Sequence, residues 1–201
     1  MELSTNSKSL HLNKTTYVNL RWIGIIGQFA TINSVAFIFK FEFNFILANC
    51  VVLIGVLSNI ILINYFKKNQ LQETISLIFL ILDILQLSIL LYLTGGIINP
   101  FSIFLIIPAI FASSSLSIKT NILLIFFTIS SILFLTFIHQ ELPSPLNDYV
   151  FSFHYYYSVP IALIIALIFL SFFALTFGNE SKVRKDALDK IQEVISKEHE
   201  L

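Results

Sequence analysis

Six long apolar runs are the feature that most limits what this chain can fold into. Of its 201 residues, 56% are hydrophobic and only 12% are charged, which is a membrane-protein composition. A bilayer core is ~30 Å thick, and about 20 helical residues cross it. Because the runs have this length and lack strict alternation, they favour helices over strands. We therefore predict an all-α membrane protein, a bundle of six transmembrane helices at about Leu20–Phe39, Phe45–Phe66, Ile75–Leu93, Phe101–Ile118, Ile122–Ile138 and Val159–Phe177.

The positive charges predict how this bundle is oriented. Lys and Arg collect in the cytoplasmic segments of membrane proteins, and a cytoplasmic N-terminus leaves only Lys40 outside. Both termini are then cytoplasmic, the N-in/C-in topology, and the turn at 94–100 and the loop at 139–158 face the periplasm of a bacterial inner membrane. The basic residues on the predicted cytoplasmic side are Lys8, Lys14, Arg21, Lys67, Lys68, Lys119, Lys182, Arg184, Lys185, Lys190 and Lys197.

Changes in composition divide the chain into three segments. Residues 1–19 form a polar cytoplasmic tail, and 20–177 form the six-helix membrane domain. Residues 178–201 are charged and helical in pattern, with Leu188, Ile191 and Ile195 at heptad-like spacing. A stripe this narrow predicts a parallel coiled coil with a second copy, so we expect a homodimer; the alternative is a solvated tail.

The connection between the third and fourth runs is the most distinctive short segment. Its sequence is Gly95-Gly96-Ile97-Ile98-Asn99-Pro100-Phe101. Glycine tolerates positive φ and allows close approach to the backbone, a residue before proline avoids helical conformation, and proline suits the first turn of a helix. By these arguments alone the segment is a tight turn between two helices.

The third run contains the only acidic residue in the middle of a predicted span, Asp83, with Gln86 on the same face. An ionisable group at this depth costs about 2.5–3.5 kcal/mol and indicates function. We predict either a protonated carboxyl bonded to a neighbouring helix or a coupling role. Twelve residues, ~18 Å of helix, separate Asp83 from Gly95, so a head group at the turn would not touch it. Pro108 in the fourth run predicts a kink and is a further candidate coupling residue.

The start of the first run predicts a membrane-entry motif. Arg21 is expected to extend its charge into water, and Trp22 to lie in the interfacial aromatic belt. Gly24 and Gly27 share one helix face, which predicts a close helix–helix contact.

The remaining polar residues indicate no catalytic site. Asn49 and Asn59 are expected to bond neighbouring helices, and Cys50 in an apolar span is not expected to be a redox switch. The net charge of zero gives no reason to expect a nucleic-acid partner, and the surrounding partner is membrane lipid. We predict no metal site, because the four potential ligands in the loop at 139–158 lack a recognised spacing: His139, Glu141, Asp148 and His154.

Three sequence features together resemble the sensor region of RegB/PrrB-type (ActS-like) redox-responsive histidine kinases. These are Leu20-Arg21-Trp22, Gly27-Gln28 and the heptapeptide at 95–101, which fits a Gly-Gly-x-x-Asn-Pro-Phe pattern at every fixed position. The resemblance implies that the heptapeptide binds ubiquinone and reports the state of the respiratory chain. The residues so implied are Gly95, Gly96, Ile97, Ile98, Asn99, Pro100 and Phe101.

The same resemblance implies partners that this chain does not contain. In the family a cytoplasmic kinase core, with a phospho-accepting histidine and an ATP-binding domain, follows the membrane region and acts on a response regulator. Here His199-Glu200-Leu201 imitates the start of a phospho-acceptor box, but we interpret it as linker. We expect the chain to be inactive as a kinase alone, and Cys50 does not correspond to the family's redox-active cysteine.

The chemistry of the turn predicts how a quinone would be held. Unpaired N–H groups at the start of the fourth helix, together with the Asn99 amide, are expected to donate to the ring carbonyls. Phe101 is expected to stack on the ring, and quinone and quinol are expected to bind with different free energies. The rival predictions are a small membrane transporter, a membrane enzyme and a structural anchor without a ligand.

Overall fold

The computed structural model describes residues 12–143 and 152–199, and its helical architecture confirms the predicted all-α class. Within these residues there are six α-helices, two short 3₁₀ helices and one pair of two-residue strands. In chain order they are β1 (Leu12–Asn13), α1 (Lys14–Phe37), α2 (Phe45–Tyr65), β2 (Gln70–Leu71), α3 (Glu73–Tyr92), η1 (Gly96–Ile98), η2 (Pro100–Ile106), α4 (Ile107–Ser115), α5 (Ile118–Phe137) and α6 (Phe153–His199).

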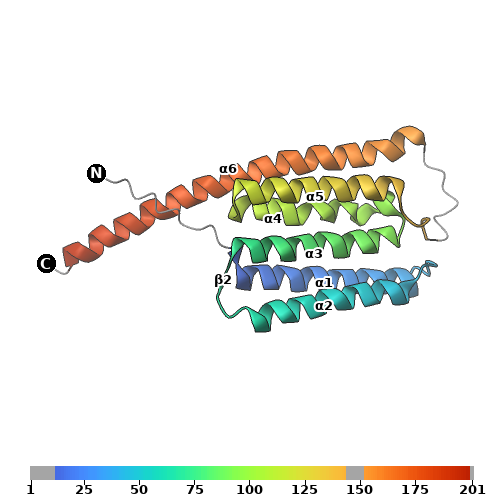
Figure 1. Cartoon of the computed structure of the whole chain (residues 1–201), viewed down its shortest axis with the longest axis horizontal. Coiled ribbons are helices and arrows are strands. Elements are labelled where there is room, and N and C mark those ends of the chain that lie inside the picture. Colours follow the sequence, from blue (N-terminus) through green and yellow to red (C-terminus); the bar gives the residue numbers. More distant parts are fainter. Residues whose placement is uncertain (1–11, 144–151, 200–201) are drawn as a thin grey trace.

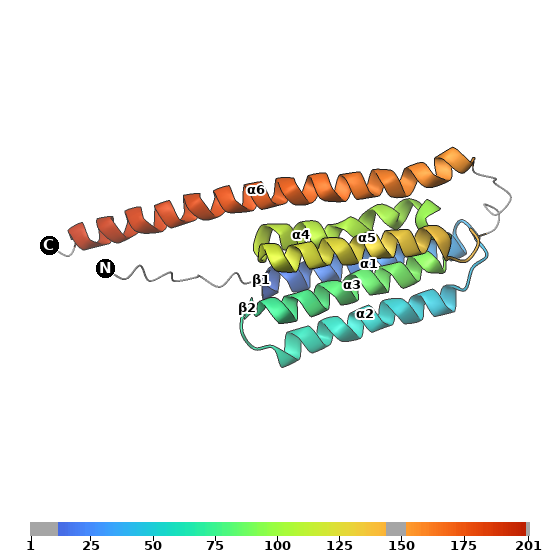
Figure 2. The same ribbon diagram turned by 45° about the horizontal axis from the view of Figure 1, so that its top comes forward.

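The helices lie side by side in one bundle (Figure 1). α2 lies at one side and packs on α1, whereas α6 lies at the opposite side and packs on α4 and α5 (Figure 2). α3 lies between these two groups and contacts α2, α4 and α5. The start of α1 and the C-terminal part of α6 are at the same end of the bundle, and the turn at 93–99 is at the other end.

Four helices are long and apolar enough to cross a membrane: α2, α3, α5 and the Phe153–Gly178 part of α6. Pro100–Ser115 is apolar but shorter, and α1 is not among the four. Large apolar side chains cover the outer surface, among them Ile54 and Phe126, which are more than half exposed, as lipid-facing side chains are. The membrane assignment is supported, while the count of six spans stays a prediction.

The first helix begins earlier than expected. Asn13 caps α1 by accepting a hydrogen bond from the Thr16 N–H, and β1 pairs antiparallel with β2 through Leu12 and Leu71. Part of the segment predicted as a polar tail is therefore a strand and helix, and residues 1–11 lie outside the described residues. Because α1 begins at Lys14, Arg21 lies inside the helix and not at its start.

The fourth predicted span is not one α-helix with a kink in its interior. It is the 3₁₀ helix η2 followed by the short helix α4, and Pro108 lies in the first turn of α4. Proline has no N–H to donate and its ring crowds the carbonyl four residues earlier, so an α-helix begins there more easily than it continues. The tighter 3₁₀ winding before Pro108 avoids that conflict.

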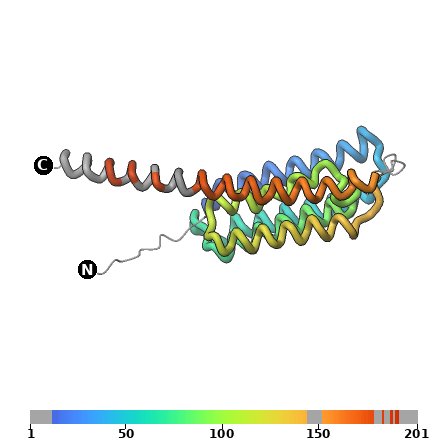
Figure 3. Tube along the Cα trace, turned by 90° about the horizontal axis from the view of Figure 1, so that it is seen from above, coloured from blue at the N-terminus to red at the C-terminus, as the bar shows by residue number. Residues whose placement is uncertain are grey.

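α6 crosses the predicted boundary at 178 without a break and extends beyond the other helices (Figure 3). It passes so close to α4 that a Cβ added to Gly178 would lie 2.9 Å from the Ser114 carbonyl oxygen. Leu188 and Ile191, beyond this crossing, are exposed. The coiled coil that they would form with a second copy stays a prediction, and Glu200 and Leu201 lie outside the described residues.

Candidate functional site: an apolar cavity between α1, α3 and η2–α4

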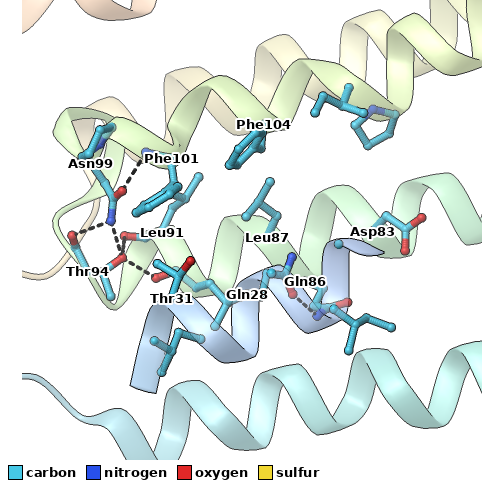
Figure 4. Close-up of a pocket in the computed structure, with 18 of the residues that line it drawn as sticks. Gln28, Thr31, Asp83, Gln86, Leu87, Leu91, Thr94, Asn99, Phe101 and Phe104 are labelled. Atoms are coloured by element: carbon cyan, nitrogen blue, oxygen red, sulfur yellow. Dashed lines mark hydrogen bonds between the residues drawn. The ribbon is translucent and has the colours of Figure 1, made fainter. Parts of the chain in front are cut away.

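A cavity of about 670 Å³ lies between the two packed groups of helices. α1 packs on α2, whereas α4 packs on α5 and α6. The cavity is the space between α1 and η2–α4, and α3 runs along it. Figure 4 shows Phe101 and Phe104 on one side and Leu87, Gln86 and Asp83 on the other. The residues that line the cavity include Asp83, Gln86, Asn99, Phe101, Phe104 and Pro108.

The same cavity borders both Asp83 and the turn at 95–101, which were expected to be separate sites. Asp83 and Asn99 both line it, although a head group at the turn was expected not to reach Asp83. The three candidate coupling residues Asp83, Gln86 and Pro108 all border the same space. The helix length of ~18 Å between Asp83 and Gly95 is unchanged, but the cavity extends along α3 and therefore borders both Asp83 and the turn.

The glycines of the heptapeptide have the predicted backbone conformation but different neighbours. Gly95 has φ 103° and Gly96 has φ 63°, both in the region that favours glycine. A Cβ at Gly95 would lie 2.4 Å from Leu142, and one at Gly96 would lie 2.4 Å from His139. The close approach that the glycines permit is thus made by the segment after α5.

The heptapeptide divides into two halves. Gly95, Gly96 and Ile97 are buried, and neither they nor Ile98 line the cavity. Asn99, Pro100 and Phe101 do line it. The first half therefore builds the turn, and the second half forms the cavity wall.

The N–H groups that were expected to be free at the start of the fourth helix are already bonded. The Asn99 carboxamide oxygen accepts from the Phe101 N–H at 2.9 Å, and the Ser102 N–H donates to the Asn99 carbonyl at 2.9 Å. The Asn99 NH₂ donates to the Thr94 hydroxyl at 2.7 Å and to the Thr94 carbonyl at 3.1 Å. The expectation of free donors at this turn is wrong, because Asn99 caps η2 with its own side chain.

Aromatic rings form the wall on the η2–α4 side. Phe101 and Phe104 stack with ring centroids 5.9 Å apart and an interplanar angle of 25°. Further along, Phe111 of α4 stacks on Tyr17 of α1, also at 5.9 Å, which closes the cavity at the end away from the turn.

A buried ion pair lies at that closed end. The Arg21 guanidinium contacts Asp83 Oδ1 at 2.8 Å through Nη2 and donates to it at 2.9 Å through Nε. Tyr17 donates to the other oxygen of Asp83. The Arg21 group also donates to Ser58 at 2.6 Å and to Asn59 at 3.3 Å, so both charges have several hydrogen-bond partners.

The position expected for Arg21 is wrong. Its side chain is only 5% exposed and does not extend into water. Seven residues of α1 precede it, because α1 begins at Lys14, so Arg21 lies about two turns inside the helix and level with Asp83. The predicted bond from Asp83 to a neighbouring helix is confirmed, with Arg21 and Tyr17 of α1 as partners, but the carboxyl forms an ion pair where a protonated carboxyl was expected. Trp22 is partly buried against the apolar cores.

Between the ion pair and the turn, two glutamines meet across the cavity. Gln86 Nε2 of α3 donates to Gln28 Oε1 of α1 at 2.9 Å (Figure 4). A Cβ at Gly55 of α2 would lie 2.5 Å from both polar atoms of the Gln86 amide, so Gly55 provides the room that this amide occupies. The sequence patterns do not predict that these three residues meet.

Gly24 and Gly27 do not form the close helix contact that was predicted. A Cβ at either position would have no neighbour within 4 Å, and both residues line the cavity. Their missing side chains enlarge the cavity. The predicted interhelical bonds of the asparagines are confirmed: Asn49 bonds Asn33 at 3.1 Å, and Asn59 bonds Arg21.

Sequence reasoning missed Tyr17, Phe104 and Phe111 as parts of this site. The available signal was charge: Arg21 and Asp83 are a basic and an acidic residue inside apolar helices, and such groups pair with each other. In residues 12–143 and 152–199 there is no cluster of three His, Cys, Asp or Glu side chains that could hold a metal ion. Asp148, one of the four ligands considered, lies outside these residues, and His139 bonds the Tyr156 hydroxyl at 2.9 Å.

Comparison with known proteins adds one relative. No protein-family model matches the chain, and no solved structure matches it significantly. The chain is similar to the sensor histidine kinase RegB of Cereibacter sphaeroides, with 29% identity over 194 residues. The alignment covers 92% of this chain and 41% of RegB, so the chain spans about two fifths of that relative's length. The resemblance to RegB-type kinases that the sequence motifs predicted is thereby confirmed.

Proposed function

We propose that this chain is the membrane sensor portion of a two-component redox-responsive histidine kinase, which binds ubiquinone and relays the redox state of the quinone pool. The observation that carries the proposal is the cavity whose wall includes Asn99, Pro100 and Phe101. The similarity to RegB supports the sensor part of the proposal. The kinase core would be supplied by the part of such a protein that this chain does not cover, and a response regulator would be its separate partner.

The cavity suits a flat ring with an apolar tail. Its volume of about 670 Å³ lies in the range of small-molecule sites, and its wall is mostly apolar with a few polar groups. Phe101 and Phe104 offer ring faces, with the Gln28–Gln86 pair on the opposite side. Phe104 and Ile107 are 46% and 52% exposed, which favours entry of a membrane-soluble ligand from the side of the bundle.

A continuous set of elements leads from this cavity to the output end. Phe101 and Phe104 belong to η2, η2 leads directly into α4, and α4 packs along α6. α6 then continues to His199 as one helix. A difference in binding free energy between quinone and quinol would bias the position of α4, and this bias would reach a dimeric linker through α6.

Filling the cavity tests the proposal. In nanodiscs, the chain is expected to bind decylubiquinone, and Gly27→Leu is expected to weaken binding by about tenfold or more. Leucine at position 27 meets no atom within 4 Å at its Cβ, so the helix bundle should accept it. Binding would be measured by equilibrium dialysis for the oxidised and the reduced form separately.

The matched control is Ser130→Leu on the exposed face of α5, which adds similar volume away from the cavity. It should bind as the wild type does. If the wild type binds neither redox form, the quinone proposal fails and a structural anchor is favoured. If Gly27→Leu binds normally, the ligand does not occupy this cavity.

A further inference from the structure

We infer that the Gln28 amide, held by Gln86, is the group that donates a hydrogen bond to a carbonyl oxygen of the ring in this cavity. The inference rests on the proposed function and deepens it. It moves the polar recognition of the ligand from the turn at 95–101 to the middle of α1 and α3.

The polar groups at the two ends of the cavity already have hydrogen-bond partners. The donors of the turn that border the cavity are bonded internally, because the Phe101 N–H donates to the Asn99 side chain and the Asn99 NH₂ donates to Thr94. At the closed end, Arg21 and Tyr17 both donate to Asp83. A ring carbonyl could use either set only by breaking hydrogen bonds that are already made, at a cost in binding free energy.

The hydrogen bond between the two glutamines leaves the NH₂ group of Gln28 free to donate. Gln28 Oε1 accepts from Gln86, so its NH₂ group retains both hydrogens. Among the described residues the Gln28 NH₂ has no hydrogen-bond partner, although it borders an apolar cavity. Figure 4 shows the nitrogen of Gln28 turned toward the Phe104 side and its oxygen toward Gln86. An unpaired amide donor in such a place is costly unless a ligand accepts from it.

Gly55 determines where the Gln86 amide lies. The Gln86 amide occupies the space that Gly55 leaves open, with both of its polar atoms 2.5 Å from where a Cβ would be. This confines the Gln86 amide between α2 and α1, where it donates to Gln28. Gln28 is therefore the ligand-contacting residue, and Gln86 and Gly55 are positioning residues.

The ligand class follows from the geometry. An amide donor that faces stacked aromatic rings across an apolar space suits a planar ring that carries a carbonyl oxygen. The same donor would suit a long-chain amine or alcohol less well, because neither has a flat face for Phe101 and Phe104.

The test uses the full chain in nanodiscs with decylubiquinone carrying ¹³C at its carbonyl carbons. Gln28→Met removes the donor at nearly constant volume, and we expect it to weaken binding of the oxidised form by about tenfold, the value of one hydrogen bond. Infrared difference spectra should show one carbonyl band at the lower frequency of a hydrogen-bonded carbonyl in the wild type. That band should return to the frequency of the free carbonyl in Gln28→Met.

Two further variants separate contact from general packing. Gly55→Ala displaces the Gln86 amide and should weaken binding about as much as Gln28→Met does. Asn49→Leu removes the other amide pair between helices, Asn33–Asn49, which does not line the cavity, and it should change neither the affinity nor the carbonyl band.

The outcomes are distinguishable from failure of the proposed function. If the wild type binds and Gln28→Met keeps both the affinity and the shifted band, this inference is overturned while the quinone proposal stands. If Asn49→Leu loses as much affinity as Gln28→Met, general loosening explains the effect and the inference is likewise overturned. If the wild type binds no decylubiquinone, both proposals fail.

Discussion

At the scale of single residues, the ion pair of Arg21 and Asp83 shows why a buried charge must be judged with its partner. Asp83 alone indicated either a neutral carboxyl or a functional one. In the folded chain, Tyr17 donates to Asp83, while Ser58 and Asn59 accept from Arg21, so both members of the pair have further hydrogen bonds. Two charges that are removed from water together and fully bonded cost far less than either one alone.

Removing the acid should therefore destabilise the bundle. Asp83→Ala leaves the Arg21 guanidinium buried without its counter-charge, and the free energy of unfolding is expected to fall by about 3–5 kcal/mol. Unfolding of the purified chain in mixed detergent micelles would measure this. The double variant Arg21→Met with Asp83→Leu should regain most of the loss, since it leaves no unpaired charge. Equal stability of Asp83→Ala and the wild type would mean that the pair is not formed in the membrane.

At the scale of elements, the turn at 93–99 and the helix η2 decide the shape of the site. Gly95 and Gly96 adopt positive φ, and their open faces receive Leu142 and His139. Asn99 ends this turn and caps η2, which aims Phe101 and Phe104 at the cavity. The motif thus supports the site through its backbone, and its last three residues form part of the wall.

A side chain at Gly95 should disturb this element. Gly95→Ala combines a φ of 103° with a Cβ placed 2.4 Å from Leu142, so we expect a loss of about 1–3 kcal/mol in the free energy of unfolding. Adding Leu142→Ala should restore part of the loss, because it removes the collision but not the backbone strain. Gly24→Ala is the control: it has no close neighbour and lies inside α1, so alanine, which favours helix over glycine, should not lower the free energy of unfolding.

At the scale of the whole molecule, α6 is the element that connects the bundle with the region beyond it. It runs from Phe153 to His199 and passes α4 at Gly178, where the Ser114 backbone is too near for a side chain. A movement of α4 at this crossing must move α6 too, because packed helices shift as rigid bodies rather than deform.

Widening that crossing should be measurable. Gly178→Leu is expected to move α6 away from the C-terminal end of α4 by roughly 1–2 Å at this crossing. Spin labels on cysteines at Val183 of α6 and at Ile118, the first residue of α5 just after α4 ends at Ser115, would report this separation by electron resonance in a Cys50→Ser background; both positions are exposed. Thr176→Leu, on the exposed face of α6, should leave the distance unchanged. An unchanged distance in Gly178→Leu would contradict the close packing.

The amino-acid sequence was enough to predict the class of the protein, since apolar runs of bilayer length permit little other than helices. It also determined the conformation of Gly95 and Gly96, because that conformation follows from local sterics, and it was enough to establish the likeness to RegB. Only the tertiary structure decided that Arg21 pairs with Asp83, that Gly24 and Gly27 border a cavity, and that Gln28 meets Gln86. These relations depend on the rotation and depth of helices that are far apart in the chain, which periodicity within one helix cannot specify.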